Sequence, residues 1–261
     1  MLSVSTALAR LQDGLGESFP DLPGTRIIDV AFPLNDAFDP LLWCGQQAQW
    51  PQFYWQQRNG DEELAALGAV KTFSSLDAAN RFLCQTGRQD LRIGGLNAFE
   101  PQQGSLVLPR LEWHRCGGRA VLRLVLHSDI SLREDAATAR AFLASLTTTQ
   151  ATPGAIPPLL SERHSSDYPQ WQAMIARATK AISAGEMDKV VLARATDLQF
   201  AAPLDAVSIM AASRRSNLNC FHFLMAFNAR QAFFGSTPER LWRRRGALLR
   251  TEALAGTGAN H

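Results

Sequence analysis

The sequence predicts a mixed fold in which β-strands dominate the first half and helices pack outside them. Two turn signals, Asn59-Gly60 and Gly117-Gly118, each follow a strand-like run. The branched apolar run 120–126 suits an interior strand, and other segments carry apolar residues at helical spacing. With 261 residues, of which 46% are hydrophobic, the chain can bury a sizeable core.

The N-terminal elements are a helix, a strand and a hairpin. Apolar residues at helical spacing over residues 4–11 predict a short amphipathic helix. The runs 26–30 and 53–58 are strand-like. The second run meets Asn59-Gly60, a dipeptide suited to the positive φ angles of a type I′ turn, so we expect a hairpin there.

A helix and a set of strands complete the first half. Ser75 is placed as the capping residue of a helix over 75–83. Further extended segments are predicted at 92–93, 106–108 and 111–115. Gly117-Gly118 supplies a tight turn into the strand 120–126, and residues 134–146 form a helix.

Residues 151–166 form the linker-like part of the chain, since they contain Pro153-Gly154 and Pro157-Pro158. We expect this segment to cross over from a first region, residues 1–150, to a second, residues 167–261. The first region is the strand-dominated half. The second holds the residues that could carry chemistry.

Composition argues against a nucleic-acid partner. Twenty-six basic residues against 24 acidic ones give a formal net charge of +2, which is too small to imply a nucleic-acid surface by itself. The dense basic run 243–245 precedes Gly246. It is predicted to mark a solvated hairpin turn rather than a phosphate-binding patch.

Cysteine spacing and apolar runs indicate the compartment. Cys44, Cys84, Cys116 and Cys220 include no Cys-x-x-Cys pair, which argues against a disulfide framework or a zinc site and favours a reducing compartment. The sequence shows no secretory signal pattern and no run of roughly eighteen apolar residues. We therefore expect a cytoplasmic protein without membrane contact, and no obligate protein partner is evident.

Lys189 opens a predicted strand over 188–195, which follows a helix that Asp167 caps and Gly185 ends. Alternation places Lys189 at the start of an apolar row. A lysine that loses hydration in such a setting gives up its proton more readily and can act as a general base near neutral pH. The alternative, which this run alone favours, is a strand-end lysine whose head stays in water.

Glu239 follows Thr237 and Pro238, which together are typical of a helix start. Thr237 is placed as the N-cap and Pro238 at the first helical position, so a simple capping motif is the favoured interpretation. The functional interpretation places Glu239 at a strand-to-helix corner that faces a cleft. Burial there would favour the protonated carboxyl and let it donate a proton.

Other reactive side chains give weaker signals. Cys220 and His222 would share a strand face, a spacing that a metal could use, but without a second pair a satisfied core histidine beside a buried thiol is favoured. The sequence contains no Gly-x-Ser-x-Gly, phosphate-binding P-loop, Gly-x-Gly-x-x-Gly or His-Glu-x-x-His motif. No metal-ligating residue is assigned.

Three segments taken together resemble the chorismate-utilising enzymes: DKVVLAR at 188–194, STPERL at 236–241 and TEALAGT at 251–257. The three in this order are far more specific than any one of them. The run PQFYWQQRNGDEE at 51–63 is similar to the menaquinone-pathway isochorismate synthases in particular. The resemblance spans nearly all of the chain.

The resemblance implies an α+β fold with two stacked antiparallel β-sheets and outer helices. It also implies an enzyme that uses Mg²⁺ and converts chorismate to isochorismate. Lys189 would deprotonate the water that attacks C2, and Glu239 would protonate the departing C4 hydroxyl. Residues 167–261 would then be the first part of the chorismate-binding catalytic region.

The segment TEALAGT would form the substrate-binding part of the cleft. By resemblance, Leu254 lines it, while Ala255, Gly256 and Thr257 approach the substrate. Aminodeoxychorismate synthases carry a nucleophilic lysine at the place of Ala255, and anthranilate synthases lack the lysine found here at 189. Water is therefore the expected nucleophile, although salicylate synthases share Lys189 and Glu239.

Members of the resembled family continue past the position of His261, and the continuation bears the Mg²⁺-binding carboxylates. The resemblance thus predicts a fold incomplete at its C-terminal end, no turnover of chorismate by the polypeptide as given, and aggregation through open apolar strand edges near Phe221 and Leu248. Two alternatives stay open. The chain could belong to another chorismate-utilising type, such as a salicylate or anthranilate synthase, or be a non-catalytic truncated binding module.

Overall fold

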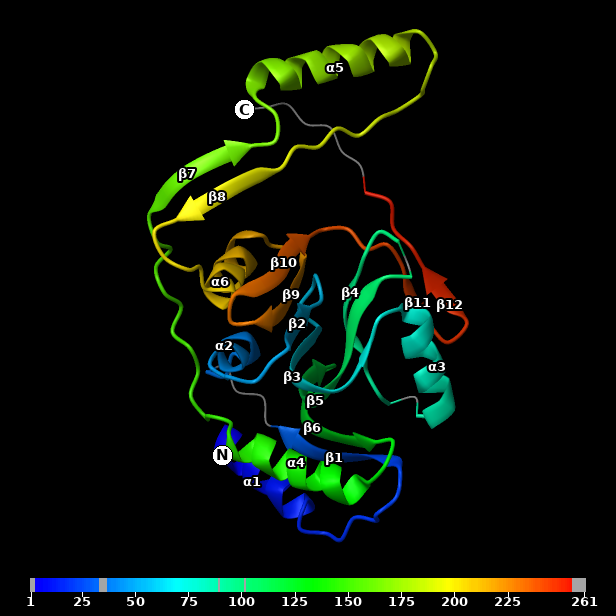
Figure 1. Ribbon diagram of the computed structural model, residues 1–261, viewed down its shortest axis with the longest axis vertical. Coiled ribbons are helices and arrows are strands. Elements are labelled where there is room, and N and C mark those ends of the chain that lie inside the picture. The colour runs from blue at the N-terminus through cyan, green and yellow to red at the C-terminus, as the bar shows by residue number, and fades with distance from the viewer. Residues whose placement is uncertain (1–2, 33–36, 89, 101, 255–261) are drawn as a thin grey trace. The chain divides into compact units, whose positions relative to one another are not determined.

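A computed structural model describes residues 3–32, 37–88, 90–100 and 102–254 (Figure 1). The chain divides into two compact units: unit 1, Met1–Gly154 with Ala206–His261, and unit 2, Ala155–Asp205. Every strand pair of the described residues is antiparallel. The expected α+β class with antiparallel sheets and outer helices is confirmed.

The main sheet of unit 1 has eight strands in the order β1-β6-β5-β3-β2-β9-β10, with β4 paired to β5. Its strands are β1 Gly24–Phe32, β2 Gln52–Gln56, β3 Glu62–Phe73, β4 Gly94–Asn97, β5 Gly104–Cys116, β6 Arg119–Ser128, β9 Phe221–Asn228 and β10 Gln231–Thr237. A separate hairpin consists of β11 Arg243–Arg245 and β12 Leu248–Arg250. The strands expected at 26–30, 53–58, 106–108, 111–115 and 120–126 are confirmed, and the segments at 106–108 and 111–115 belong to one long strand. The extended segment predicted at 92–93 is wrong, since the neighbouring strand β4 begins only at Gly94.

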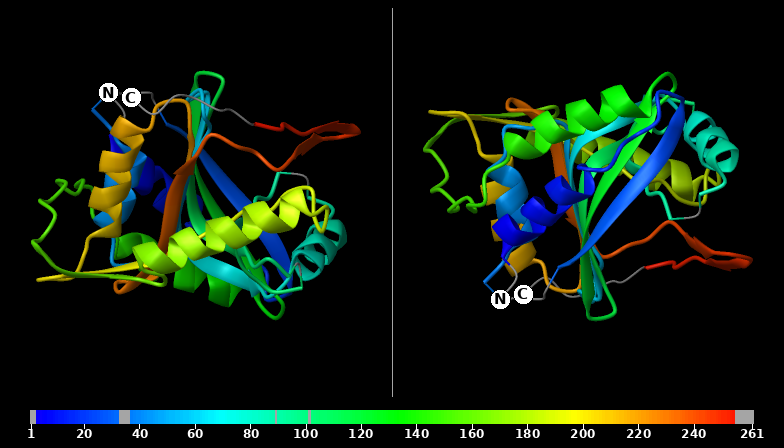
Figure 2. Two further views of the ribbon diagram at one scale, coloured as in Figure 1. Left: turned by 90° about the horizontal axis from the view of Figure 1, so that it is seen from above. Right: turned by 90° about the horizontal axis from the view of Figure 1, so that it is seen from below.

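Helices cover both faces of this sheet (Figure 2). They are α1 Val4–Gly14, α2 Pro40–Gly45, α3 Leu76–Thr86, α4 Leu132–Ala144 and α6 Ala206–Ser216. The main apolar core lies between one sheet face and α1, α2, α4 and α6. A smaller core lies between α3 and the opposite face, where Phe82 packs against Phe73 and Leu108. The second face is therefore only partly covered by a helix of unit 1.

Local capping and turn chemistry explains where these elements begin and end. Ser75 caps α3 as expected, because its hydroxyl accepts a hydrogen bond from the backbone N–H of Ala78 at 3.2 Å. Gly117 and Gly118 both have positive φ, which confirms a tight two-residue turn between β5 and β6.

The turn between β2 and β3 differs from the expected type I′ geometry, although the hairpin itself is confirmed. Gly60 has a φ of +74°, but Asn59 does not have positive φ. The loop instead closes between Gln57 and Glu62, whose N and O atoms lie 2.8 Å apart. The Asn59 side chain accepts a hydrogen bond from the Asp61 N–H at 3.3 Å, which stabilises this longer loop.

Unit 2 consists of a two-stranded sheet and one helix. They are β7 Leu159–His164, α5 Tyr168–Ser183 and β8 Thr196–Phe200. The predicted helix is confirmed as α5, with Asp167 and Gln170 in a reciprocal capping box at 2.8 and 2.9 Å. The segment 151–166 contains strand β7 in addition to its loop residues. Within the described parts of the chain, no helix is long and apolar enough to cross a membrane.

Candidate functional site

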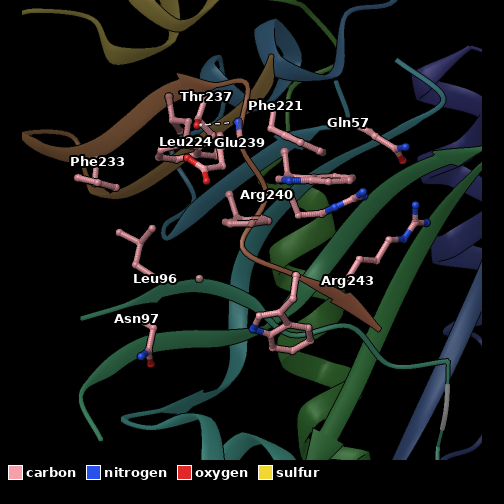
Figure 3. A pocket seen from close by; sticks show the side chains of 15 residues that line it. Gln57, Leu96, Asn97, Phe221, Leu224, Phe233, Thr237, Glu239, Arg240 and Arg243 are labelled. Carbon is pink, nitrogen blue, oxygen red and sulfur yellow. Dashed lines mark hydrogen bonds between the residues drawn. The ribbon is translucent and has the colours of Figure 1, made fainter. Parts of the chain in front are cut away.

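An aromatic pocket of about 540 Å³ lies on unit 1, on the sheet face that also carries α3 (Figure 3). Its floor consists of Phe53, Trp55, Phe221, Phe223 and Phe233. Tyr54, between Phe53 and Trp55 on β2, points to the main core, so strand alternation presents these two aromatic side chains to the opposite face. Trp55 stacks on Phe221 at 6.2 Å and Phe223 on Phe233 at 5.7 Å between ring centroids.

Two glycines let the backbone approach this floor closely. A Cβ atom at Gly94 would lie 2.9 Å from the ring of Phe53, and one at Gly235 would lie 2.8 Å from the ring of Phe223. Larger residues there would push the rings out of place. Strands β4 and β10 can therefore border the pocket without closing it.

Glu239 lies at the border of the pocket, directly after β10, and its side chain is exposed. The predicted helix after Pro238 is wrong, because the chain continues without regular structure toward β11. Arg58 donates a hydrogen bond to the carbonyl oxygen of Pro238 at 2.8 Å. This occupies a carbonyl that a helix would use. Thr237 accepts a hydrogen bond from the Glu239 N–H at 3.2 Å, as a turn rather than a helix cap (Figure 3).

Glu252 fixes the loop that carries Glu239. Its carboxylate pairs with Arg58 at 3.0 Å and also with Arg240. Both guanidinium groups lie over the ring of Phe221, at 5.4 and 5.8 Å from its centroid. We call these four residues the Glu252 clamp. The clamp joins the segment TEALAGT to the residues on either side of Glu239.

Sequence analysis did not predict the clamp. Arg58 and Glu252 are almost two hundred positions apart; Arg58 follows β2 of the main sheet and Glu252 follows β12 of the separate hairpin, so no local sequence signal joins them. The sequence nevertheless contains a signal that could have pointed to these residues. Each of the three charged clamp residues belongs to a segment that carries the family resemblance.

Lys189 lies in unit 2 and is exposed. The strand predicted over 188–195 is wrong, since residues 189–195 have no regular structure and β8 begins at Thr196. A strand requires a hydrogen-bonded neighbouring strand, and among the described residues no strand pairs with 188–195; only Ala195, next to β8, bonds to Ser165. The expected apolar row around Lys189 is therefore not formed, and Lys189 and Glu239 belong to different compact units.

Of the expected substrate-binding residues, Leu254 is the last described one, with an exposed fraction of 48%. Ala255, Gly256 and Thr257 lie outside the described residues. The run 243–245 does belong to a hairpin, but it forms strand β11, and the turn is at Gly246 with a φ of +56°. Arg243 lines the aromatic pocket and lies 3.6 Å from Glu62.

The interpretation of His222 as a satisfied core histidine is confirmed. Its Nδ1 lies 2.8 Å from the hydroxyl of Ser236, which lies 2.8 Å from that of Ser213. Burial, together with the charge of Arg214, lowers the pKa of His222. Within the described residues, no group of three His, Cys, Asp or Glu side chains could hold a metal ion. These residues therefore do not fit a protein-bound Mg²⁺ site.

Comparisons with known proteins give a consistent result. A family model described as chorismate binding enzyme matches residues 96–261. Isochorismate synthase MenF of Escherichia coli is 58% identical over 262 residues, covering 100% of this chain and 61% of that protein. MenF of Haemophilus influenzae is 35% identical over 224 residues, covering 86% of this chain and 50% of that protein.

A solved structure of the menaquinone-specific isochorismate synthase MenF from E. coli matches with a TM-score of 0.91 and 57% identity. The match covers 95% of this chain and 58% of that one. The chain thus spans between half and two thirds of the length of these relatives. Over the matched part, the fold of this chain is the same as that of the solved relative.

Proposed function

The chain belongs to the chorismate binding enzyme family, and from this premise we propose that it carries the acid and base residues of an isochorismate synthase. The relatives named above, with identities of 58% and 35%, are both isochorismate synthases, and this observation carries the proposal. It favours this activity over the salicylate or anthranilate synthase type. We place the reaction in menaquinone biosynthesis, as in the solved relative.

In the proposed reaction, water forms a bond to C2 of chorismate while the bond between C4 and its hydroxyl breaks. The two ring double bonds shift, and one water enters as another leaves, so the change is an isomerisation. Lys189 takes the proton of the attacking water, and Glu239 gives a proton to the departing hydroxyl. Opposite proton duties are needed because hydroxide is a poor leaving group and is scarce at neutral pH.

The aromatic pocket supports this assignment of Glu239. Its flat apolar floor suits the ring of chorismate, while Arg240 and Arg243 place positive charge at the border, where the carboxylates of the substrate would lie. The Glu252 clamp holds the loop of Glu239 against Phe221. The clamp residues are thus positioning residues in this proposal, and Glu239 is the catalytic acid.

Mg²⁺ is part of the proposal as a cofactor of the complete reaction. It would neutralise carboxylate charge on the substrate when bound. The described residues do not supply its ligands, so no step is derived through it. Every step above uses only Lys189, Glu239 and water.

A chimera tests the proposal, because the chain spans 61% of the E. coli relative. The 261 residues replace the matched part of that relative, and isochorismate formation from chorismate is measured with Mg²⁺. We expect activity, and a loss of about 100- to 10,000-fold in kcat for Lys189→Ala and for Glu239→Gln. Lys180→Ala and Glu17→Gln, which remove the same groups from exposed positions, serve as matched controls and should leave kcat unchanged.

The proposal is wrong if the folded chimera forms no isochorismate. It also fails if either catalytic variant keeps the kcat of its matched control. Circular dichroism of each variant establishes that a loss of activity is not a loss of fold.

A further inference from the structure

A second groove, of about 720 Å³, lies on unit 1 between α3 and the adjoining ends of β1, β3 and β6. We call it the α3 groove. It shares no lining residue with the aromatic pocket. Its lining includes Thr25, Lys71, Phe73, Arg81, Phe82 and His127.

Aromatic side chains form the inner wall of the α3 groove. Phe73 and Phe82 pack with ring centroids 5.2 Å apart, and both are mostly buried. Lys71 Nζ lies 5.5 Å from the centroid of Phe82, and the ring of His127 meets Phe82 edge-on at 4.9 Å. The wall therefore offers apolar surface next to a held cation.

The charged side chains of the α3 groove differ in their ion-pair partners and in their exposure to solvent. Lys71 Nζ lies 2.5 Å from Asp129 Oδ2 and 3.4 Å from His127 Nε2. Asp129 is the acid of this lining, and its side chain is 73% exposed, against 29% for Lys71. Thr25 fixes the other ring nitrogen of His127 at 2.9 Å.

Arg81 adds a second cation from α3. It lies one turn before Gln85, which also lines the groove, so helical spacing directs both toward it. Among the described residues, Arg81 has no ion-pair partner, whereas Arg88 is bound by Asp90 at 2.9 Å. Lys71 and Arg81 together exceed the single charge of Asp129, so the groove carries net positive charge.

We propose that the α3 groove binds a small organic carboxylate with a single-ring apolar body. The ring would lie against Phe73 and Phe82, and the carboxylate would accept hydrogen bonds from Lys71 and Arg81. Asp129, whose side chain is 73% exposed, would turn into water and give up its contacts with Lys71 at 2.5 Å and with His127 at 3.2 Å. The alternative is a purely structural role, in which the Lys71–Asp129 ion pair stabilises the turn after β6. That role does not involve Arg81. The inference stands on this groove alone and does not rest on the proposed isochorismate synthase activity.

Benzoate is the probe ligand. Benzamide, which keeps the ring but lacks the charge, and acetate, which keeps the carboxylate but lacks the ring, are the control ligands. Binding to the whole chain is followed by ligand-observed saturation-transfer NMR. We expect saturable binding of benzoate, and affinity at least about tenfold weaker for benzamide and acetate. Lys71→Met, which keeps the aliphatic stem on Phe82, and Arg81→Gln should each weaken benzoate binding by about tenfold.

Two variants serve as controls. Arg119→Gln removes the same charge at the far end of β6 and should bind benzoate as the parent chain does. Arg243→Gln removes a cation of the aromatic pocket. The proposal is overturned if benzamide binds as tightly as benzoate, if no saturable binding occurs, or if Arg243→Gln abolishes binding while Lys71→Met and Arg81→Gln retain it. Thermal melts confirm that the exposed variant Arg81→Gln is folded.

Discussion

At the scale of single residues, the buried carboxylate of Glu63 and the guanidinium group of Arg214 are each held by several partners. Glu63 accepts hydrogen bonds from the Tyr54 hydroxyl at 2.7 Å and from Arg115 at 2.8 Å. Arg214 donates to the oxygen of Tyr54 at 2.7 Å and pairs with Asp39. Burial, with the nearby charge of Glu63, raises the pKa of Tyr54. The network joins β2, β3 and α6 at the edge of the main core.

Arg214→Leu should therefore destabilise the protein by about 3 kcal/mol, because it leaves buried oxygen atoms of the network without their cation. Urea unfolding monitored by circular dichroism measures the difference. Arg215→Leu, the exposed neighbour on the same helix, is the matched control and should cost less than about 0.5 kcal/mol. Equal losses for the two variants would contradict a structural role for the network.

Stability should also fall as the pH drops from 7 toward 5. Burial lowers the pKa of His114, His127 and His222 below the ordinary value of 6.5. Between that value and the lower pKa of the folded protein, the unfolded chain binds more protons, so the free energy of unfolding decreases as the pH falls. His222→Gln should show a smaller decrease than the parent chain in urea titrations at each pH. A decrease of the same size in both would rule out a contribution of His222.

Which site residues could be predicted depends on how local their signal is. Lys189 and Glu239 stand in short motifs, so the family resemblance singles them out from the sequence, and their catalytic roles stay predictions. The Glu252 clamp could not be predicted, since Arg58 follows a strand of the main sheet and Glu252 follows the separate β11–β12 hairpin, and the two meet only in the tertiary fold. The aromatic floor of the pocket could not be predicted either. Alternation shows which side chains of one strand share a face, but it does not show which strands are neighbours in the sheet.

At the scale of elements, helices and turns with local sequence signals were predicted correctly, whereas elements that depend on contacts with distant residues were predicted poorly. Helices α1, α3, α4 and α5 have capping residues and helical spacing in the sequence, and the turn at Gly117-Gly118 has its own conformational signal. The strand over 188–195 was wrong because its apolar pattern has no partner strand among the described residues. The helix after Pro238 was wrong because Arg58 binds the carbonyl that the helix would need.

The clamp gives a prediction for the β11–β12 hairpin. Glu252→Gln should weaken both guanidinium contacts and increase hydrogen exchange in residues 239–250, with little change in the remainder of the main sheet. The measurement is hydrogen–deuterium exchange resolved by peptide. Glu17→Gln is the control. Unchanged protection of the hairpin would show that the clamp does not hold it.

At the scale of the whole molecule, unit 1 presents an open apolar edge. Strand β10 lies at the end of the main sheet, and Phe233 on it is 54% exposed. Unpaired strand edges with apolar side chains promote association between chains. Aggregation stays a prediction, but the edge expected near Phe221 is wrong, since β9 lies between β2 and β10; among the described residues β10 is the edge strand at this end of the sheet.

Phe233→Lys should reduce self-association, since a charge on an edge strand opposes pairing with another sheet. Static light scattering across a concentration series measures the effect. Ile130→Lys, at a loop position with 76% exposure, is the control and should change association less. If both substitutions act equally, general hydrophobicity rather than the β10 edge drives association.

The central claim is that this chain carries the groups that exchange the C4 hydroxyl of chorismate for water at C2. Its most direct test is isotope labelling, with the chimera incubated with chorismate in H₂¹⁸O and the isochorismate analysed by mass spectrometry and NMR. We expect one ¹⁸O atom in the product, located at C2. An unlabelled C2 hydroxyl would mean that the oxygen migrates within the substrate, and it would contradict the roles given to Lys189 and Glu239.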